Sequence, residues 1–166
     1  MKSATAWFDH YAESHQNKTN KLIHWLCIPV ILLSTLGLMQ SIPFFIEGPA
    51  WIGFGTLFAA AALVFYFRLS WTIGIGMAAV SIAAIAVNAA IVYSGISLPV
   101  FSAVVFFVAW VLQFIGHKIE GKKPSFFEDL QFLLVGPAWL LQFIYKRMGI
   151  RVETRREFTA LASDPS

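Results

Sequence analysis

Charged side chains are scarce in this chain and are missing from long stretches of it. Asp, Glu, Lys and Arg make up 13% of the 166 residues, whereas a soluble domain carries about a quarter. The stretches at 25–46, 48–67 and 69–117 contain none of them. A helix needs about 20 apolar residues to cross a bilayer. These stretches therefore exclude an ordinary soluble domain and indicate a membrane protein.

Two residue types that build metal and redox sites are also few. The single cysteine, Cys27, cannot form an intramolecular disulfide or a thiolate pair, and we expect it to serve apolar packing. The chain has four histidines, which are too few for the histidine-rich two-metal sites of membrane oxygenases. One mononuclear metal ion is the most that this set of side chains supports.

The uncharged stretches predict an all-α fold, a polytopic membrane helical bundle. Ser94, Gly95 and Pro99 are turn formers that divide the longest stretch into two spans. The transmembrane helices that we predict cover approximately residues 22–42, 50–68, 71–93 and 98–116. The expected organisation is a single membrane-embedded catalytic domain at 1–150, followed by a polar C-terminal tail at 151–166.

Basic residues favour one side of the membrane. With four spans, all 12 Lys and Arg residues fall on the side of the N-terminus, and Glu47 lies on the other side. The positive-inside rule then places both termini in the cytosol. We favour a bacterial plasma (inner) membrane, or the endoplasmic reticulum membrane if the chain is eukaryotic. Anionic lipid headgroups account for the net charge of +3 without any nucleic acid.

Residues 126–145 are apolar but fit a full span poorly. Gly136-Pro137 interrupts them near the middle, and both flanks are basic. A fifth span would also move the Arg-rich tail to the outside, against the positive-inside rule. We therefore expect a re-entrant or interfacial helical hairpin that is covered by protein.

All four histidines, His10, His15, His24 and His117, fall at or just outside the ends of predicted spans, on the same side of the membrane. A lone interfacial histidine is commonly an amphipathic side chain at its preferred depth. A polar cluster at a membrane helix is more typical of a functional site, and imidazole is a ligand of iron, zinc, copper and nickel. The pattern predicts one metal site at the membrane surface, with His10 as its weakest ligand.

The N-terminal segment must bend to bring its histidines together. His15 and His24 are nine residues apart and would face opposite sides of a straight helix. Asn17, Thr19 and Asn20 are capping or turn residues that allow a new helix to begin between them. In that helix Asn20 and His24 share one face. We expect Asn17 and Asn20 to cap the helix or to orient the metal ligands from behind.

A second segment carries matching polar residues. Gln113, His117 and Glu120 share a helical face, and Gly116 permits the close approach of another backbone or of a ligand. Glu120 can supply the carboxylate of a two-histidine, one-carboxylate site. Alternatively it orients His117 or a lysine without touching the metal, and Gln113 would act in the same way. The predicted catalytic residues are His15, His24, His117 and Glu120.

These two segments resemble a family of small membrane proteins typified by the fungal 2-hydroxy fatty acid dioxygenase of phytosphingosine degradation. The resemblance covers the chain apart from its tail. It is carried by YAESHQNKTNKLIHWLCIP at 11–29 and QFIGHKIEGKKPSFFEDLQFLLVGPAWLL at 113–141. His15, His24 and His117 match the pattern of the family, whereas His10 does not.

The resemblance implies iron(II)-dependent α-oxidation, in which a 2-hydroxy fatty acid reacts with dioxygen and becomes an acid one carbon shorter. It implies Fe(2+) as the cofactor, held by histidines, with membrane lipids around the site. Lys21 or Lys122 can attract the carboxylate of such a substrate, although lysines at these positions also fit the positive-inside pattern.

Other functions stay open from the residues alone. A zinc-dependent membrane lipid hydrolase would use Glu120 as its general base, and a haem electron carrier would need histidines facing each other inside the bilayer. A non-enzymatic lipid-binding or transport scaffold would use the histidines structurally. Metal analysis, a haem spectrum and the variants His24→Ala and His117→Ala separate these functions from the dioxygenase.

Overall fold

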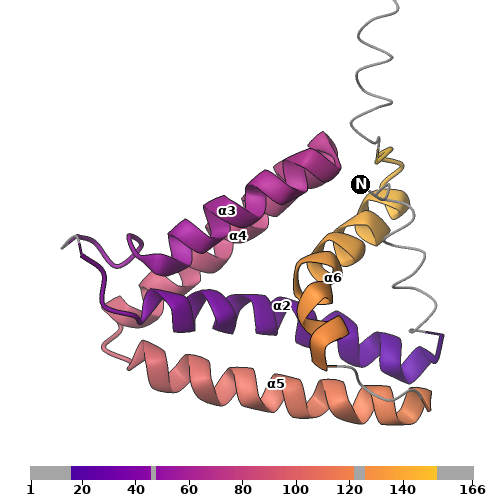
Figure 1. Ribbon diagram of the computed structural model, residues 1–166, viewed down its shortest axis with the longest axis horizontal. Helices are drawn as coiled ribbons and strands as arrows, with labels where there is room; N and C mark the ends of the chain where they lie inside the picture. The colour runs from indigo at the N-terminus through magenta and orange to yellow at the C-terminus, as the bar shows by residue number, and fades with distance from the viewer. Residues whose placement is uncertain (1–15, 46–47, 122–125, 153–166) are drawn as a thin grey trace, which may run out of the picture.

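The computed structural model describes residues 16–45, 48–121 and 126–152, and for 126–133 it describes the backbone alone. In these ranges the chain folds into helices joined by short turns, without any β-strand. The predicted all-helical class is confirmed. The helices, labelled as in Figure 1, are α2 (Lys18–Gln40), α3 (Phe54–Leu69), α4 (Trp71–Tyr93), α5 (Leu98–Glu120) and α6 (Phe126–Arg147).

Helix α2 begins where the sequence predicts a new helix. Asn17 is its N-cap, and the Asn17 side-chain oxygen accepts hydrogen bonds from the backbone N–H groups of Thr19 (2.8 Å) and Asn20 (3.4 Å). These bonds satisfy backbone donors that have no partner within the first turn of a helix. The capping role predicted for Asn17 is confirmed.

Helices α2 and α5 lie side by side and antiparallel (Figure 1). Cys27 and Ile31 of α2 pack with Ala109 of α5, so Cys27 serves apolar packing as predicted. Further along, Gly37 lies so close to α5 that a β-carbon at this position would collide with the Ser102 hydroxyl. Small residues at such contacts let two membrane helices approach closely.

Helices α3 and α4 form a second antiparallel pair, joined at Ser70. The Ser70 N–H donates to the Tyr66 carbonyl at the end of α3 (2.9 Å), and the Ser70 hydroxyl oxygen accepts from the Ile73 N–H (3.5 Å). Ser70 therefore ends one helix and caps the next. In Figure 1 this pair is inclined to the α2–α5 pair.

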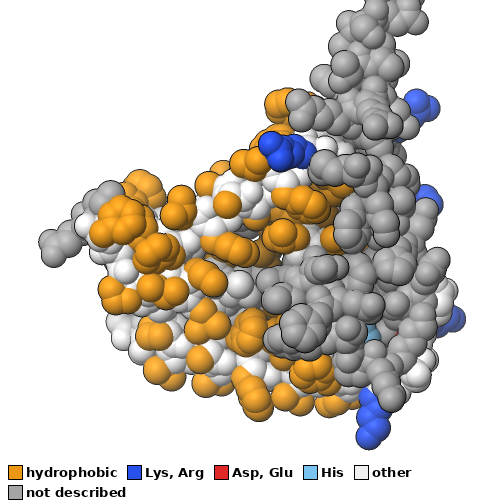
Figure 2. Space-filling model, viewed as in Figure 1, with side chains coloured by type: hydrophobic (Ala, Val, Ile, Leu, Met, Phe, Trp, Pro, Cys, Tyr) orange, Lys and Arg blue, Asp and Glu red, His pale blue; other side chains and the backbone are white. Residues whose placement is uncertain are grey.

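Three of the predicted spans have the length and composition that a membrane requires. Helices α2, α4 and α5 are long and apolar enough to cross, and α3 is a shorter apolar helix of 16 residues. At 1.5 Å per residue α3 extends about 24 Å, which is less than the roughly 30 Å of the hydrocarbon core. Figure 2 shows hydrophobic side chains spread over the described helices, as contact with lipid chains would require.

Helix α6 corrects the prediction of a hairpin. A single helix runs from Phe126 to Arg147, with Pro137 inside it. Pro137 cannot donate a backbone hydrogen bond, but the Tyr66 hydroxyl donates a 2.8 Å hydrogen bond to the Leu134 carbonyl in the preceding turn. The carbonyl that loses its helical partner at Pro137 is that of Leu133, four residues earlier. The Tyr66 bond joins the adjacent carbonyl and ties α6 to α3 beside the proline. The sequence could not show this bond, because Tyr66 lies in a distant part of the chain.

The largest hydrophobic core forms where α6 packs across α2, α3 and α4. Its buried residues are Ile28, Tyr66, Leu69, Ile73, Met77, Val135, Ala138 and Leu140. Two contacts add to it: the Tyr145 hydroxyl donates to the Thr72 carbonyl (3.2 Å), and the rings of Trp25 and Phe143 meet with centroids 5.3 Å apart. Because Trp25 adjoins His24, this core holds α6 beside one of the predicted metal ligands.

Candidate metal centre

His24 and His117 meet at the interface between α2 and α5. Their ring centroids are 5.0 Å apart and their ring planes are at 89°. They expose only 2% and 7% of their surfaces. His24 lies near the start of α2 and His117 in the last turn of α5, so the antiparallel packing of the two helices brings these histidines together. His24 and His117, which the sequence assigns to one metal site, therefore lie together, and metal binding by them stays a prediction.

A backbone hydrogen bond orients His24. Its Nδ1 lies 3.0 Å from the Asn20 carbonyl oxygen. A carbonyl oxygen only accepts hydrogen bonds, so in the neutral ring this contact places the proton on Nδ1 and the lone pair on Nε2. Metal-binding histidines are commonly fixed by such a bond from the ring nitrogen that does not bind the metal. In this orientation Nε2 is the ring nitrogen with which His24 would bind a metal ion.

Glu120 ties the end of α5 to the start of α2. Its carboxylate accepts hydrogen bonds from the Gln16 N–H (2.7 Å), from the Asn17 N–H (3.0 and 3.1 Å) and from Asn20 Nδ2 (2.9 Å). A carboxylate is favoured there because the backbone N–H groups at a helix N-terminus carry partial positive charge. This docking role of Glu120 was not among the roles predicted from the sequence. The sequence did hold one signal for it: Asn20 shares a helix face with His24, and Glu120 shares a helix face with His117, so a contact between the two histidines also brings Asn20 and Glu120 together.

Gly116 provides the close approach that the sequence predicts. Asn20 is fully buried, and a β-carbon at residue 116 would collide with its Oδ1 atom. Asn20 Oδ1 and Gln113 Oε1 are both buried oxygens with no hydrogen-bond partner among the described residues. Burying a polar atom without a partner is unfavourable, so these two oxygens fit a site that binds a further polar group.

Comparison with known sequences extends over nearly the whole chain. The sequence model of the Mpo1-like family, whose description reads "2-hydroxy-palmitic acid dioxygenase Mpo1-like", matches residues 1–148. The chain belongs to the Mpo1-like family. The matched range contains all four histidines and both helices of the His24–His117 pair. No curated protein and no solved structure matches the chain.

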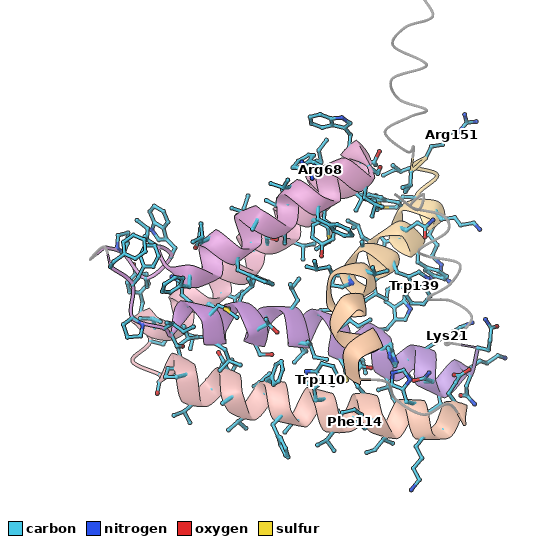
Figure 3. All side chains as sticks on the ribbon, viewed as in Figure 1. Lys21, Arg68, Trp110, Phe114, Trp139 and Arg151 are labelled. Atoms are coloured by element: carbon cyan, nitrogen blue, oxygen red, sulfur yellow. The ribbon has the colours of Figure 1, made fainter. Side chains whose placement is uncertain are left out.

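Three of the site residues predicted for this Mpo1-like protein lie in parts of the chain that the structure does not describe. These are His10, His15 and Lys122. Lys21 is described and is partly buried near the start of α2, where Figure 3 labels it. The contact of Lys21 with a substrate carboxylate stays a prediction, as does metal binding by His10 and His15.

The described residues do not by themselves form a complete site for a metal ion. Within 16–45, 48–121 and 126–152, no group of three or more His, Cys, Asp or Glu side chains is placed to hold an ion. With metal–nitrogen bonds of about 2.1 Å, two imidazoles on one ion have centroids about 4.5–5.3 Å apart for bond angles between a right angle and a tetrahedral one. The observed 5.0 Å falls in that range. His24 and His117 therefore fit two ligand positions, and a complete site needs ligands from beyond the described ranges.

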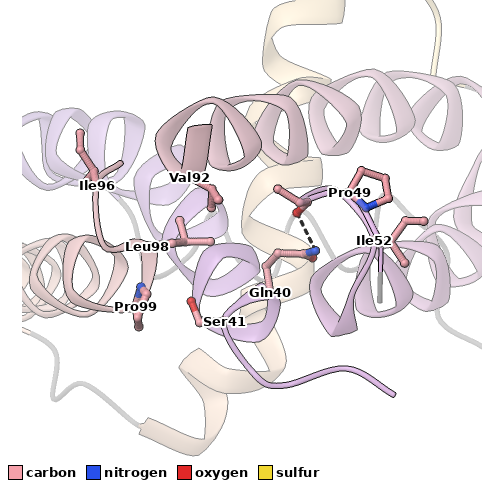
Figure 4. A pocket seen from close by; sticks show the side chains of 10 residues that line it. Gln40, Ser41, Pro49, Ile52, Val92, Ile96, Leu98 and Pro99 are labelled. Atoms are coloured by element: carbon pink, nitrogen blue, oxygen red, sulfur yellow. Dashed lines mark hydrogen bonds between the residues drawn. The ribbon is translucent and has the colours of Figure 1, made fainter. Parts of the chain in front are cut away.

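A separate pocket of about 330 Å³ opens at the other ends of α2 and α5 (Figure 4). Gln40, Ser41 and Leu98 are among its lining residues, and no described lining residue is charged or a histidine. The Gln40 amide already donates to the Ala50 carbonyl (2.9 Å). This pocket lacks groups for acid–base or metal chemistry, so the candidate site is the end of the bundle with the histidine pair.

Proposed function

We propose that this protein is an iron(II)-dependent dioxygenase that converts 2-hydroxy fatty acids, with dioxygen, into acids one carbon shorter. Membership of the Mpo1-like family supports a dioxygenase that acts on a 2-hydroxy fatty acid. The observation that carries the proposal is the buried contact between His24 and His117 at the end of two membrane helices. Two buried imidazoles at this distance suit one shared metal ion.

His24 and His117 would hold the iron, with His15 and then His10 as further ligands. Bound iron(II) would supply the electron-transfer chemistry that lets dioxygen react with the substrate. The Asn20 carbonyl keeps the His24 ring in the orientation for coordination. Glu120 keeps α2 and α5 in register by binding the backbone at the start of α2. These contacts hold the two ligands in place before the substrate arrives.

The position of the histidine pair suits an amphipathic acid. The exposed apolar side chains of α2 and α5, such as Leu22, Leu26 and Phe114, offer a surface along which an acyl chain can lie. Lys18 and Lys118 lie at the same helix ends as the histidines, where they can attract a carboxylate. Holding the first two carbon atoms of the substrate beside the histidine pair supplies rate by proximity and orientation.

The test begins without oxygen. Protein purified in detergent is loaded with iron(II) and 2-hydroxypalmitate, oxygen is admitted, and mass spectrometry measures the acid one carbon shorter. We expect His24→Ala and His117→Ala to abolish the product and to lower the bound iron. Gln40→Ala, at the far end of α2, is the control and should retain both. Product from either histidine variant, or in the presence of excess chelator, would contradict the proposal.

The same preparation distinguishes the alternative functions. Stoichiometric zinc together with hydrolysis of a lipid ester would replace the dioxygenase by a metallohydrolase. A protein that binds no metal and forms no product would instead be a lipid-binding or transport scaffold.

A further inference from the structure

Gln113 is a buried amide next to the histidine pair. It lies one turn, about 6 Å along the axis, from His117 on the face of α5 that contacts α2. It is nearer the middle of the helix than His117 is, and it exposes 7% of its surface. Beyond it along α5, Ala109 packs with Cys27 and Ile31 in a buried apolar cluster. Gln113 is thus the last polar residue between the histidine pair and an apolar part of the interface.

The surroundings of Gln113 leave its side-chain oxygen without a hydrogen-bond partner among the described residues. This oxygen, Oε1, is buried. A polar group within a membrane helix is unfavourable unless it is paired, and such residues commonly mark a binding site. An amide both donates and accepts while staying uncharged, so a neutral hydroxyl group is a matching partner.

We propose that Gln113 recognises the 2-hydroxyl group of the substrate and thereby selects 2-hydroxy acids over unsubstituted fatty acids. The inference rests on the proposed function. A fatty acid with its carboxylate at the membrane surface has its second carbon deeper in the membrane, and Gln113 is deeper than His117. Oε1 would accept the hydroxyl proton in a hydrogen bond and the amide N–H would donate to the hydroxyl oxygen, with no proton transferred.

The selectivity follows from the cost of an unpaired amide oxygen. When palmitate occupies the site, no hydroxyl group reaches Gln113, and the buried Oε1 stays without a partner. A site that is built to bind a hydroxyl group discriminates strongly against the analogue that lacks it, for this reason. Gln113 would be a specificity-determining residue, whereas His24 and His117 would determine whether the reaction proceeds at all.

The test measures binding rather than turnover. Iron(II)-loaded protein in lipid nanodiscs is held without oxygen, and the binding of radiolabelled 2-hydroxypalmitate and palmitate is measured after subtraction of empty nanodiscs. We expect the wild type to prefer the hydroxy acid and Gln113→Leu to lower that preference by about tenfold through weaker binding of the hydroxy acid. Ser102→Ala is the matched control, because it also removes a buried oxygen without a hydrogen-bond partner from α5. It should leave the preference unchanged.

A failure of the role proposed for Gln113 can be distinguished from a failure of the proposed dioxygenase function. A Gln113→Leu variant that keeps the wild-type preference overturns the role of Gln113, and so does a wild type that binds both acids equally. Neither binding result tests the dioxygenase activity. That activity is tested separately, by product formation in the wild type and by the loss of product in His24→Ala. A reduced preference in Ser102→Ala as large as that in Gln113→Leu would also overturn the inference.

Discussion

The hydroxyl group of Tyr66 in α3 and the backbone carbonyl of Leu134 in α6 are joined by a 2.8 Å hydrogen bond, one turn before the proline of α6. Tyr66 is 1% exposed, so the bond is shielded from water. Together with the hydrogen bond from the Tyr145 hydroxyl to the Thr72 carbonyl, it links the α3–α4 pair to α6. Because it is the shorter of the two, the Tyr66 hydroxyl should contribute measurably to the stability of this part of the bundle.

Replacing Tyr66 by Phe removes that hydroxyl and keeps the ring. We expect the free energy of unfolding to fall by about 1 kcal/mol, measured by denaturation in detergent. Tyr93→Phe is the control, because Tyr93 is exposed and the bond that it accepts from the Ala50 N–H is long, at 3.4 Å. Equal stability losses in the two variants would show that the Tyr66–Leu134 bond contributes no more to the free energy of unfolding than an exposed hydroxyl group does.

Adding one methyl group at Gly116 should damage the candidate site. In Gly116→Ala the new β-carbon would collide with Asn20 Oδ1, forcing α2 and α5 apart beside His24 and His117. Overpacking of this kind costs roughly 1–3 kcal/mol, and we expect lower thermal stability together with weaker iron binding. In Gly48→Ala the nearest atom would be 3.4 Å away, so this variant should behave as the wild type. Normal iron binding by Gly116→Ala would refute the importance of this close contact.

Removing the Glu120 carboxylate should loosen the start of α2. In Glu120→Ala the backbone N–H groups of Gln16 and Asn17 lose the acceptor described here. Hydrogen bonds to charged groups contribute about 1.5–3 kcal/mol, so amide hydrogen exchange at these two residues should accelerate about tenfold or more. Mass spectrometry of exchanged peptides measures it, and Lys118→Ala on the same turn is the control. Unchanged exchange in Glu120→Ala would mean that the docking is not maintained in solution.

Metal removal should destabilise the protein only when both described histidines are present. A ligand that binds the folded state alone raises the free energy of unfolding by RT ln(1 + L/Kd), where L is the free ligand concentration. Chelator should therefore lower the melting temperature of the iron-loaded wild type, and it should have little effect on His24→Ala or His117→Ala. The same decrease in all three proteins would show that the metal binds elsewhere.

Much of the fold could be predicted because charge is so unevenly distributed along the chain. The bounds of α4 agree with the predicted span at 71–93, and the Asn17 cap was readable from residue type and spacing. The single helix through Pro137 was not predictable, because its packing partners on α3 and α4, such as Tyr66 and Ile73, lie far from it in the sequence. The shortness of α3 was equally hidden, since its helix begins only at Phe54, after residues of similar hydrophobicity.

The candidate site was predictable at the level of helix faces. Spacing placed Asn20 with His24 and Gln113 with His117, and the structure buries all four. Spacing within a helix says nothing about the partner of a side chain on another helix. The docking of Glu120 on the start of α2 and the contact of Asn20 with Gly116 therefore became visible only with the α2–α5 register.

The hydrogen bonds of Glu120 to Gln16 and Asn17 connect positions 104 and 103 residues apart. During synthesis, α2 leaves the ribosome and enters the membrane well before α5 exists. Until α5 is inserted, the start of α2 lacks its carboxylate acceptor and His24 lacks His117. The His24–His117 contact is consequently one of the last contacts of the bundle to form, and a nascent chain that stalls before α5 would leave His24 without its partner ring.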